Sequence, residues 1–279
     1  MAGLSSNWKQ LSSKISKPSS NNNNNNTTHY NNKKKKSHTK AKEDHIQNSL
    51  KNDKHLLQLK HNRVNKDGFI NASPLEFTLW TTIGNNEIKK ENIPTTDNTI
   101  NKSEKDRRKE LGKIVAIDCE FVGAGEGRLS HLARVTIVNF YGHVVLDQYV
   151  QPRLRVTDWR TWVSGITPWH MQFAIKFDDA RARVEEILKD RVLVGHALEN
   201  DLDKLCLTHP KSLTRDTSTF PPFRAVSSGR TPGLKKLVKQ FLDLDIQNGV
   251  HNPIEDARAT MLLYRLQKNQ IEAFAKSIK

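Results

Sequence analysis

Residues 113–122 have the sequence KIVAIDCEFV, a nearly continuous apolar run with two acidic residues near its middle. Such a run is typical of a central strand that is covered on both faces. Side chains alternate along a strand, so Asp118 and Glu120 share one face while Cys119 and Phe121 occupy the other. Two neighbouring carboxylates repel each other and are costly to desolvate, which a bound cation would relieve. In the alternative interpretation, Glu120 marks the end of the strand and Asp118 caps a nearby group.

The sequence around this run predicts further strands and helices. Apolar runs predict strands at residues 134–140, 144–150 and 191–195, the first two joined by a hairpin at Tyr141-Gly142-His143. Helical spacing and capping signals predict helices at residues 177–190, 200–207, 232–242 and 253–275, the third of them opened by Thr231-Pro232. A strand meander followed by strand–helix alternation predicts an α/β domain with a mixed sheet over residues 111–279.

Charge is unevenly distributed along the chain. The 279 residues include 45 Lys+Arg and 30 Asp+Glu, a formal net charge of +15, which favours polyanionic partners such as nucleic acid. Residues 1–110 contain 21 basic and 11 acidic residues, a net of +10, and the remaining residues contain 24 and 19, a net of +5. With runs at Asn21–Asn26 and Lys33–Lys36 and few large apolar residues, residues 1–110 are predicted to be a disordered basic tail. Its lysine run is interpreted as a nuclear import signal or a grip on RNA, a solvated charge run being the alternative.

Cysteine content and hydropathy indicate the cellular environment. Cys119 and Cys206 lie far apart and outside any CxxC spacing, which predicts neither a disulfide framework nor a zinc site and favours a reducing compartment. No apolar run approaches the roughly 20 residues needed to span a bilayer. The N-terminus lacks the apolar core of a secretory signal. We therefore expect a soluble, intracellular protein with no membrane partner.

Further acidic residues follow the predicted strand at residues 191–195. Asn200, Asp201 and Asp203 lie in or near the first turn of the next helix. Ligands of open α/β sheets bind at the carboxyl ends of such strands, so each of the three is a candidate. The local sequence does not choose among them.

His251 and Asp256 flank the start of the last predicted helix. Taken alone, such an acid more often interacts with the helix dipole, and such a histidine more often lies in a surface loop. Together with the other acids, they offer hard oxygen ligands that favour Mg²⁺ or Mn²⁺ over zinc. Several carboxylates around two such ions suit in-line attack on a phosphodiester, with a histidine to take the proton of water.

Three stretches resemble, in order, the motifs of the DEDD exonuclease superfamily. They are AIDCEFVG at residues 116–123, a GH-x₄-D pattern at residues 195–201 and an H-x₄-D pattern at residues 251–256. The histidine five residues before the last aspartate is typical of the DEDDh subgroup. LARVTIVN at residues 132–139 and VTDWRTWVSGI at residues 156–166 resemble the Rex-type RNA exonucleases, in particular the branch linked to ribosomal RNA processing in fungi. The resemblance covers about residues 113–266 and leaves the tail unmatched.

The resemblance implies roles for five side chains. Asp118, Glu120, Asp201 and Asp256 would bind two divalent ions, Mg²⁺ or Mn²⁺, and His251 would be the general base. The implied fold is ribonuclease-H-like, with a five-stranded mixed sheet in the order 3-2-1-4-5 flanked by helices.

The implied activity is that of a 3′-5′ exoribonuclease that releases nucleoside 5′-monophosphates. Single-stranded RNA, in particular pre-ribosomal RNA, would be the partner, and ribosome biogenesis in the nucleus or nucleolus the setting. Many relatives have methionine where this chain has Phe121. Because this position lies on the face opposite the carboxylates, we expect altered packing and unchanged chemistry.

Two other functions are compatible with these observations. A DNA or short-oligonucleotide 3′-5′ exonuclease would carry the same motifs on the same scaffold. A catalytically silent nucleic-acid-binding subunit would explain the charge, but the complete set of four acids and a histidine disfavours it.

Candidate substrate contacts lie outside the acidic set. They are Arg128 and Leu129 in the glycine-rich loop at residues 123–130, Arg160, and Lys235 on a predicted helix. Glycines let a backbone approach a ligand closely, and a flexible loop is the alternative. Arginines beside Trp159 and Trp162 suit single-stranded nucleic acid, although we expect at least one of the two tryptophans to belong to the core.

Overall fold

The computed structural model describes residues 69–83, 88–102, 106–126 and 129–278. Their strands form a two-stranded sheet and a six-stranded sheet. The strands are β1 (Phe69–Ala72), β2 (Asn98–Asn101), β3 (Ile114–Ala124), β4 (Leu129–Asn139), β5 (Val144–Tyr149), β6 (Val156–Asp158), β7 (Val192–Gly195) and β8 (Thr214–Asp216).

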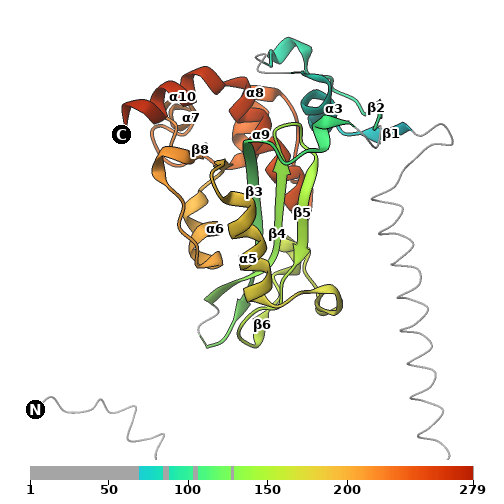
Figure 1. The fold of residues 1–279 in the computed structure, drawn as a ribbon, viewed down its shortest axis with the longest axis vertical. Helices are drawn as coiled ribbons and strands as arrows, with labels where there is room; N and C mark the ends of the chain where they lie inside the picture. Colours follow the sequence, from blue (N-terminus) through green and yellow to red (C-terminus); the bar gives the residue numbers. More distant parts are fainter. Residues whose placement is uncertain (1–68, 84–87, 103–105, 127–128, 279) are drawn as a thin grey trace, which may run out of the picture. The chain divides into compact units, whose positions relative to one another are not determined.

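The larger sheet has the strand order β5-β4-β3-β7-β8 (Figure 1). Strand β4 is antiparallel to β3 and β5, whereas β7 is parallel to β3 and β8. Counted from β3, this is the order 3-2-1-4-5, so the predicted mixed sheet and α/β fold are confirmed. The short β6 adds a sixth strand, which pairs with β3 at Gly123 and Ala124.

Helices cover both faces of this sheet. They are α3 (Pro74–Thr81), α4 (Thr161–Ser164), α5 (Phe177–Leu188), α6 (Leu198–Leu205), α7 (Pro221–Ala225), α8 (Leu234–Leu242), α9 (Pro253–Leu266) and α10 (Lys268–Ser277), with 3₁₀ helices at Lys90–Asn92, Arg107–Lys109, Pro168–Phe173 and Lys211–Leu213. Helices α5 and α6 share one core with Ile117 and Cys119 of β3. Helices α8 and α9 share the other with Ala116 of β3 and Val194 of β7. None of the described helices is both long enough and apolar enough to cross a membrane.

Strand β3 therefore divides its side chains as the alternation predicts. Phe121 packs with the α5–α6 core, on the side of Cys119, although the register with β4 shifts between Glu120 and Phe121. The face of β3 that carries Asp118 and Glu120 is the one that meets α9, because Ala116 of the same face packs in the α9 core.

Two predicted helix boundaries are wrong. Helix α8 begins at Leu234 with Gly233 as its N-cap, so Thr231-Pro232 precedes it; the Pro232 carbonyl instead accepts a hydrogen bond from His196. The single helix predicted for residues 253–275 is broken at Gln267, where φ −115° and ψ 20° depart from helical values and separate α9 from α10.

The predicted disordered tail is wrong for its described part. From Phe69 to Glu110 the described residues form β1, α3, β2 and two 3₁₀ helices, and Leu75 and Leu79 of α3 are buried in the α9 core. The physical reason is the apolar stretch PLEFTLW at residues 74–80, which buries enough surface to order a short segment. Asn21–Asn26, Lys33–Lys36 and the rest of residues 1–68 lie outside the described residues.

Buried arginines attach this N-terminal segment to the domain. The Arg265 guanidinium of α9 donates to the carbonyls of Leu79, Phe140 and Thr82. Arg258, also on α9, lies 3.2 Å from the carboxylate of Glu76 on α3. Helix α9 is therefore held between the sheet on one side and α3 on the other.

Candidate active site

Asp118 and Glu120 are positioned by the central strand β3. Both lie near the middle of an 11-residue strand that pairs with β4 along most of its length and with β7 at its start. Glu120 is 5% exposed. Because neighbours on both sides hold the backbone of β3, these two carboxylates have little freedom to move apart.

Asp201 reaches the site from the first turns of α6. It is 5% exposed, and hydrogen bonding with Cys119 opposes the rise in the pKa of its carboxyl group that burial causes. Of the three candidates on this helix, Asn200 and Asp203 are exposed, and Asp203 pairs with Lys204. Burial therefore selects Asp201.

Asp216 at the end of β8 fixes the start of α6. Its carboxylate accepts hydrogen bonds from the backbone N–H groups of Ala197 and Leu198, at 3.0 and 2.9 Å. An acid at this place satisfies the N–H groups that a helix start leaves unpaired. Sequence reasoning missed Asp216, because the three-residue strand that carries it is too short to show a period.

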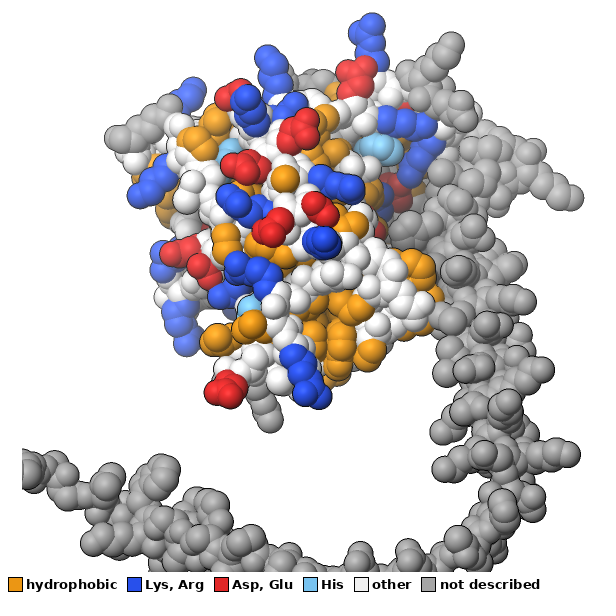
Figure 2. Space-filling model, turned by 60° about the horizontal axis from the view of Figure 1, so that its bottom comes forward, with side chains coloured by type: hydrophobic (Ala, Val, Ile, Leu, Met, Phe, Trp, Pro, Cys, Tyr) orange, Lys and Arg blue, Asp and Glu red, His pale blue; other side chains and the backbone are white. Residues whose placement is uncertain are grey.

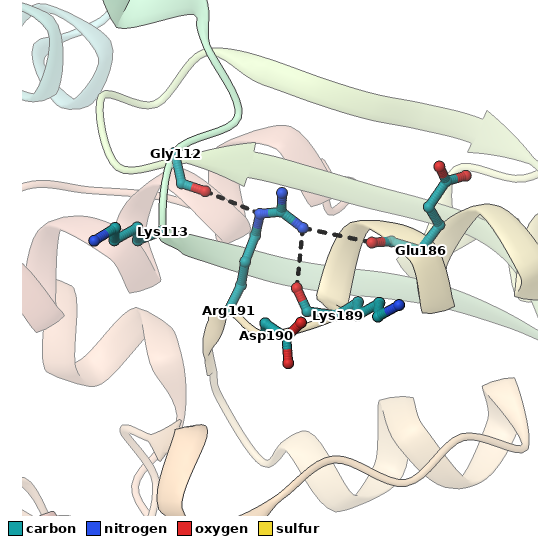
Figure 3. A pocket seen from close by; sticks show the side chains of 6 residues that line it. All are labelled: Gly112, Lys113, Glu186, Lys189, Asp190 and Arg191. Atoms are coloured by element: carbon teal, nitrogen blue, oxygen red, sulfur yellow. Dashed lines mark hydrogen bonds between the residues drawn. The ribbon is translucent and has the colours of Figure 1, made fainter.

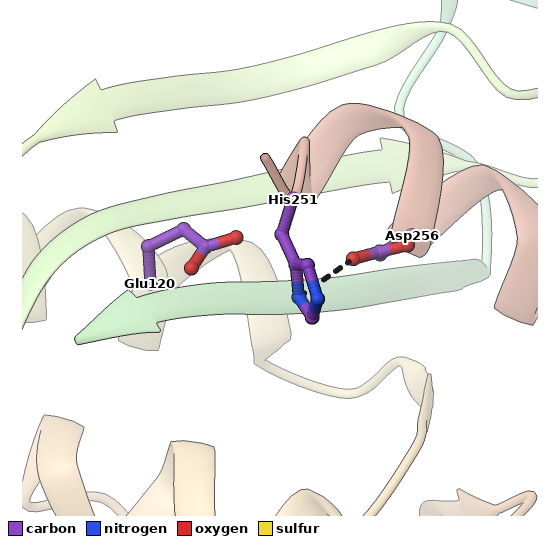
Figure 4. A group of neighbouring side chains, drawn as sticks. All are labelled: Glu120, His251 and Asp256. Carbon is purple, nitrogen blue, oxygen red and sulfur yellow. Dashed lines mark ion pairs between the residues drawn. The ribbon is translucent and has the colours of Figure 1, made fainter. Parts of the chain in front are cut away.

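Asp256 and His251 come from the start of α9. Asn252 caps this helix by accepting a hydrogen bond from the backbone N–H of Ile254. Asp256 is 2% exposed, and the Nδ1 atom of His251 lies 3.9 Å from its Oδ2 (Figure 4). Glu120, His251 and Asp256 offer ligand atoms that all lie within 4.8 Å of one another.

Gln247 is a further site residue that the sequence did not reveal. Its Nε2 donates to Oδ2 of Asp256 at 3.0 Å, and its backbone N–H donates to Oε2 of Glu255. Gln247 has a positive φ of 54° in the loop before α9. No periodicity marks such a loop residue, so no sequence signal could have identified it.

The four acids lie close enough to raise one another's pKa. Burial and the charges of Asp256, Asp201 and Glu120 hold the pKa of Asp118 well above its usual value. Burial, with the charge of Asp256, raises the pKa of Glu120 to about 8. Burial raises the pKa values of Asp201 and Asp256 to about 7. The structure thus brings the four acids together, with His251 beside them.

The cation whose charge opposes the rise in the pKa of Glu120 already has a partner. Arg134 of β4 stands opposite Glu120, and its charge opposes the rise of that residue's pKa. Its Nε and Nη2 atoms donate to the two carboxylate oxygens of Asp147, at 2.7 and 2.8 Å. Arg134 therefore leaves most of the cluster's negative charge uncompensated.

The donor set suits a hard divalent cation. Oδ1 of Asp256 is buried and has no hydrogen-bond partner among the described residues. Such an orphaned carboxylate oxygen, in a group whose pKa is raised, fits a position that a cation would fill. Asp118, Glu120, Asp201 and Asp256 are the residues that would hold it.

The candidate substrate contacts lie on separate elements. Leu129 begins β4 and is 61% exposed, whereas Arg128 lies outside the described residues. The Nη1 atom of Arg160 donates to Oγ of Ser130 at 2.7 Å. Lys235 donates to the carbonyl of Gln247, and its charge lowers the pKa of His251. Lys235 thus lies near His251, whereas Arg160 lies beside Ser130 of β4 and Gly123 near the end of β3.

A surface pocket lies away from this site. It is lined by Gly112, Lys113, Glu186, Lys189, Asp190 and Arg191 (Figure 3). These residues precede β3 and β7, whereas the acids follow or lie farther along these strands. The Arg191 guanidinium donates to the carbonyls of Gly112, Glu186, Ile187 and Lys189. Arg191 thus satisfies carbonyls at the C-terminal end of α5, and the residues that line the pocket include no converging set of catalytic side chains.

Comparison with known protein families identifies the class of this protein. A model of the exonuclease family matches residues 115–264. The chain belongs to this exonuclease family, and the prediction of an enzyme of this class is confirmed.

Similarity to individual proteins indicates which kind of exonuclease this chain resembles. The chain is 48% identical to RNA exonuclease 4 of Debaryomyces hansenii over 271 residues, which cover 96% of this chain and 93% of that protein. It is 56% identical to RNA exonuclease 4 of Candida albicans over 203 residues, which cover 72% of this chain and 70% of the relative. The resemblance to RNA exonucleases stated from the motifs is therefore confirmed.

Solved structures agree with the fold. The Neurospora crassa Pan2 catalytic unit superposes with a TM-score of 0.52 at 25% identity, covering 62% of this chain and 30% of that one. A Saccharomyces cerevisiae Pan2 exonuclease module in complex with A7 RNA gives a TM-score of 0.51 at 27% identity, covering 60% and 30%. This chain thus spans about a third of those proteins.

Proposed function

We propose that this protein is a 3′-5′ exoribonuclease that hydrolyses phosphodiester bonds and releases nucleoside 5′-monophosphates. The observation that carries the proposal is the convergence of four acids from β3, α6 and α9, Asp118 half-buried and the other three buried, with His251 beside them. Burial raises the pKa values of these acids, and Arg134, whose charge opposes the rise for Glu120, is already paired with Asp147. Such uncompensated burial is typical of functional sites.

Asp118, Glu120, Asp201 and Asp256 would hold two divalent ions, Mg²⁺ or Mn²⁺. When bound, such ions stabilise the charge that develops on the phosphate and lower the pKa of bound water. Gln247 orients Asp256 by donating a hydrogen bond to its carboxylate.

His251 is proposed as the general base. Burial and the charge of Lys235 lower its pKa below the ordinary value of 6.5, so the ring is neutral at pH 7 and able to accept a proton. Its side chain is 37% exposed, which leaves it accessible to water. The Nδ1 atom faces Asp256, whose negative charge would stabilise the imidazolium after proton transfer.

RNA is proposed as the substrate because the curated relatives are named RNA exonucleases and a structural neighbour is described in complex with RNA. Arg160 and Lys235 would contact phosphates, and Leu129 would contact the terminal nucleotide. Pre-ribosomal RNA, and a nuclear or nucleolar location, are proposed from the resemblance to the Rex-type branch. The Lys33–Lys36 run supports a nuclear location.

Product analysis on matched RNA and DNA oligomers tests this function. With Mg²⁺, 5′-labelled single-stranded RNA is expected to shorten from its 3′ end and to yield nucleoside 5′-monophosphates, and EDTA should stop the reaction. Faster degradation of the DNA oligomer would favour a DNA exonuclease. Tight binding of RNA without hydrolysis in Mg²⁺ or Mn²⁺ would favour a silent binding subunit.

A further inference from the structure

Exposed apolar side chains gather near the active site. Of the seven large hydrophobic side chains that are exposed among the described residues, Leu129, Leu154, Trp162 and Val250 lie on segments around the far end of β3 or beside His251. Trp162 is 80% exposed and Val250 is 51% exposed. Figure 2 views the domain from the end where β6 lies and shows hydrophobic side chains on this face with lysine and arginine side chains around them.

The backbone that carries Trp162 is firmly held. Helix α4 is a single turn bounded by two left-handed residues, Arg160 at φ 49° and Gly165 at φ 67°. The Ser164 hydroxyl donates toward the carbonyls of Trp159 and Arg160, and it accepts a hydrogen bond from the backbone of Ile166. The exposed indole therefore stands on an ordered turn, so little entropy would be lost when a ligand packs on it.

Helix α4 is joined directly to the loop of the proposed general base. The backbone N–H of His251 donates to the carbonyl of Val163 at 2.8 Å, the residue after Trp162. Gly165 makes room for the neighbouring loop, because a Cβ atom there would lie 2.6 Å from Cγ1 of Val250. A ligand over Val250 would thus lie next to His251, and Trp162 precedes the residue whose carbonyl holds the His251 backbone.

The two tryptophans of this segment have different environments. Trp159 packs with the buried residues Val122, Ala133 and Ile166, whereas Trp162 faces solvent. The structure therefore assigns Trp159 to the core, in line with the expectation that at least one tryptophan belongs there. Trp162 makes no such contribution to folding.

We propose that Trp162, on the α4 turn whose Gly165 lies against Val250, is a stacking platform for an unpaired base near the 3′ end of the substrate. An exposed aromatic face binds any base by stacking, and Lys235 and Arg160 supply positive charge for the adjoining phosphates. Because stacked neighbours cover the faces of bases inside a duplex, the platform favours single strands over base-paired segments. This inference rests on the proposed function for the identity of the ligand as RNA.

The test compares Trp162→Ala and Trp162→Phe with the unchanged full-length protein. Binding of a short single-stranded RNA is measured in EDTA, where no hydrolysis occurs, and KM and kcat are measured in Mg²⁺. Trp162→Ala is expected to raise Kd and KM about tenfold, a value within the range known for base–aromatic stacking. The change in KM should be larger than the change in kcat. Trp162→Phe keeps an aromatic ring and is expected to stay within about threefold.

Abasic substitutions locate the stacked nucleotide. RNAs that lack the base at one of the last three positions are titrated against the unchanged and Trp162→Ala proteins. At one position, removal of the base should weaken binding to the unchanged protein and leave binding to Trp162→Ala unaltered, because the interaction has one partner on each side. Ile278→Ala, which removes another exposed apolar side chain at the end of α10, is the matched control and should bind as the unchanged protein does.

The outcomes separate this inference from the proposed function. Hydrolysis by the unchanged protein together with unaltered Kd and KM in Trp162→Ala would overturn the platform and leave the exoribonuclease intact. It would also point to a protein partner for this apolar surface. Loss of binding in Trp162→Ala supports the platform even where no hydrolysis is seen. An equal unfolding temperature in the variants, expected for an 80% exposed side chain, excludes misfolding as the cause.

Discussion

Two regions of this protein bury charge, and they treat it in opposite ways. Where α3 meets α9, Arg265 is 1% exposed and donates to three backbone carbonyls, while its guanidinium lies 4.2 Å from the centre of the Phe140 ring. Arg258 nearby pairs with Glu76. In the active site, four carboxylates face one another, and Oδ1 of Asp256 has no partner among the described residues.

The difference separates structural from functional charge. Burial lowers the pKa of Arg265 only to about 10, so it stays charged at neutral pH and its hydrogen bonds offset the cost of burial. The acids have no equivalent partners, so their pKa values rise into the neutral range. In the first region the buried charge has partners that stabilise the folded protein. In the second region the buried carboxyl groups destabilise it unless a cation binds.

The largest expected effect is on catalysis. Asp118→Asn removes one carboxylate from the cluster and should reduce RNA hydrolysis in Mg²⁺ at least about 1,000-fold, equivalent to about 4 kcal/mol of transition-state stabilisation. In EDTA the same variant should unfold at a higher temperature, because less like charge is buried. Activity assays and thermal unfolding measure the two effects.

The matched control is Asp203→Asn. Asp203 is exposed, pairs with Lys204 and lies two residues from Asp201, so its loss should change hydrolysis less than about twofold. Full activity in the Asp118→Asn protein would remove Asp118 from the catalytic set.

The next effect is on stability alone. Arg265→Met keeps much of the side-chain volume but leaves three carbonyls without their donor, and it should lower the free energy of unfolding by about 3 kcal/mol. Denaturant unfolding measures this change, and kcat of the folded protein at low temperature should stay close to that of the unchanged chain. Arg181→Met, at a surface pair with Glu185 whose atoms lie 4.0 Å apart, should cost less than about 0.5 kcal/mol. Equal costs for the two substitutions would contradict the contrast between the regions.

The pH dependence of stability gives a third test. Between about pH 4 and pH 8 the raised-pKa carboxyls hold protons in the folded protein that they lose in the unfolded chain. Folding therefore takes up protons, and in EDTA the unfolding temperature should fall by at least about 3 °C from pH 6.5 to pH 8.5. Mg²⁺ should reverse most of this fall, because a cation replaces the protons. A rise in stability over the same range would show that the acids are ionised in the metal-free protein.

The smallest effect concerns the basic N-terminus. Residues 1–61 contain 12 lysines and three acidic residues, a net of +9. Their deletion should leave kcat and the unfolding temperature unchanged. Because phosphate contacts are lost, RNA binding at moderate salt should weaken a few-fold and depend less on salt. Deletion of residues 1–105 should also destabilise the domain, since it removes α3 and the Leu79 and Thr82 carbonyls, two of the three partners of Arg265. Identical salt dependence before and after the shorter deletion would show that this segment does not contact RNA.

The sequence predicted the features that depend on local periodicity. Strand β3 was predictable because an apolar run in which alternate residues are acidic has few other interpretations, and it places Asp118 and Glu120 on one face. Asp201 could be separated from Asn200 and Asp203 only by burial, which depends on how α6 lies on the sheet.

Features that depend on long-range contacts were not predictable. Gln247 and Asp216 act through hydrogen bonds to residues 9 and 18–19 positions away, and neither stands in a periodic pattern. Helix α3 packs on the α9 core, and Arg265 of α9 donates to the Leu79 carbonyl 186 residues away. The prediction from composition therefore placed the end of the disordered basic tail too late in the sequence, at residue 110.

The different burial of the two cysteines has a practical consequence for labelling the protein. The Cys119 thiol is buried and burial raises its pKa well above the usual value, whereas Cys206 at the end of α6 is exposed. Alkylating reagents attack the thiolate, so a maleimide dye would modify Cys206 and spare Cys119. The wild-type chain thus offers one attachment point for a fluorophore at Cys206. Binding of RNA to the labelled protein can then be followed by fluorescence without engineering either cysteine.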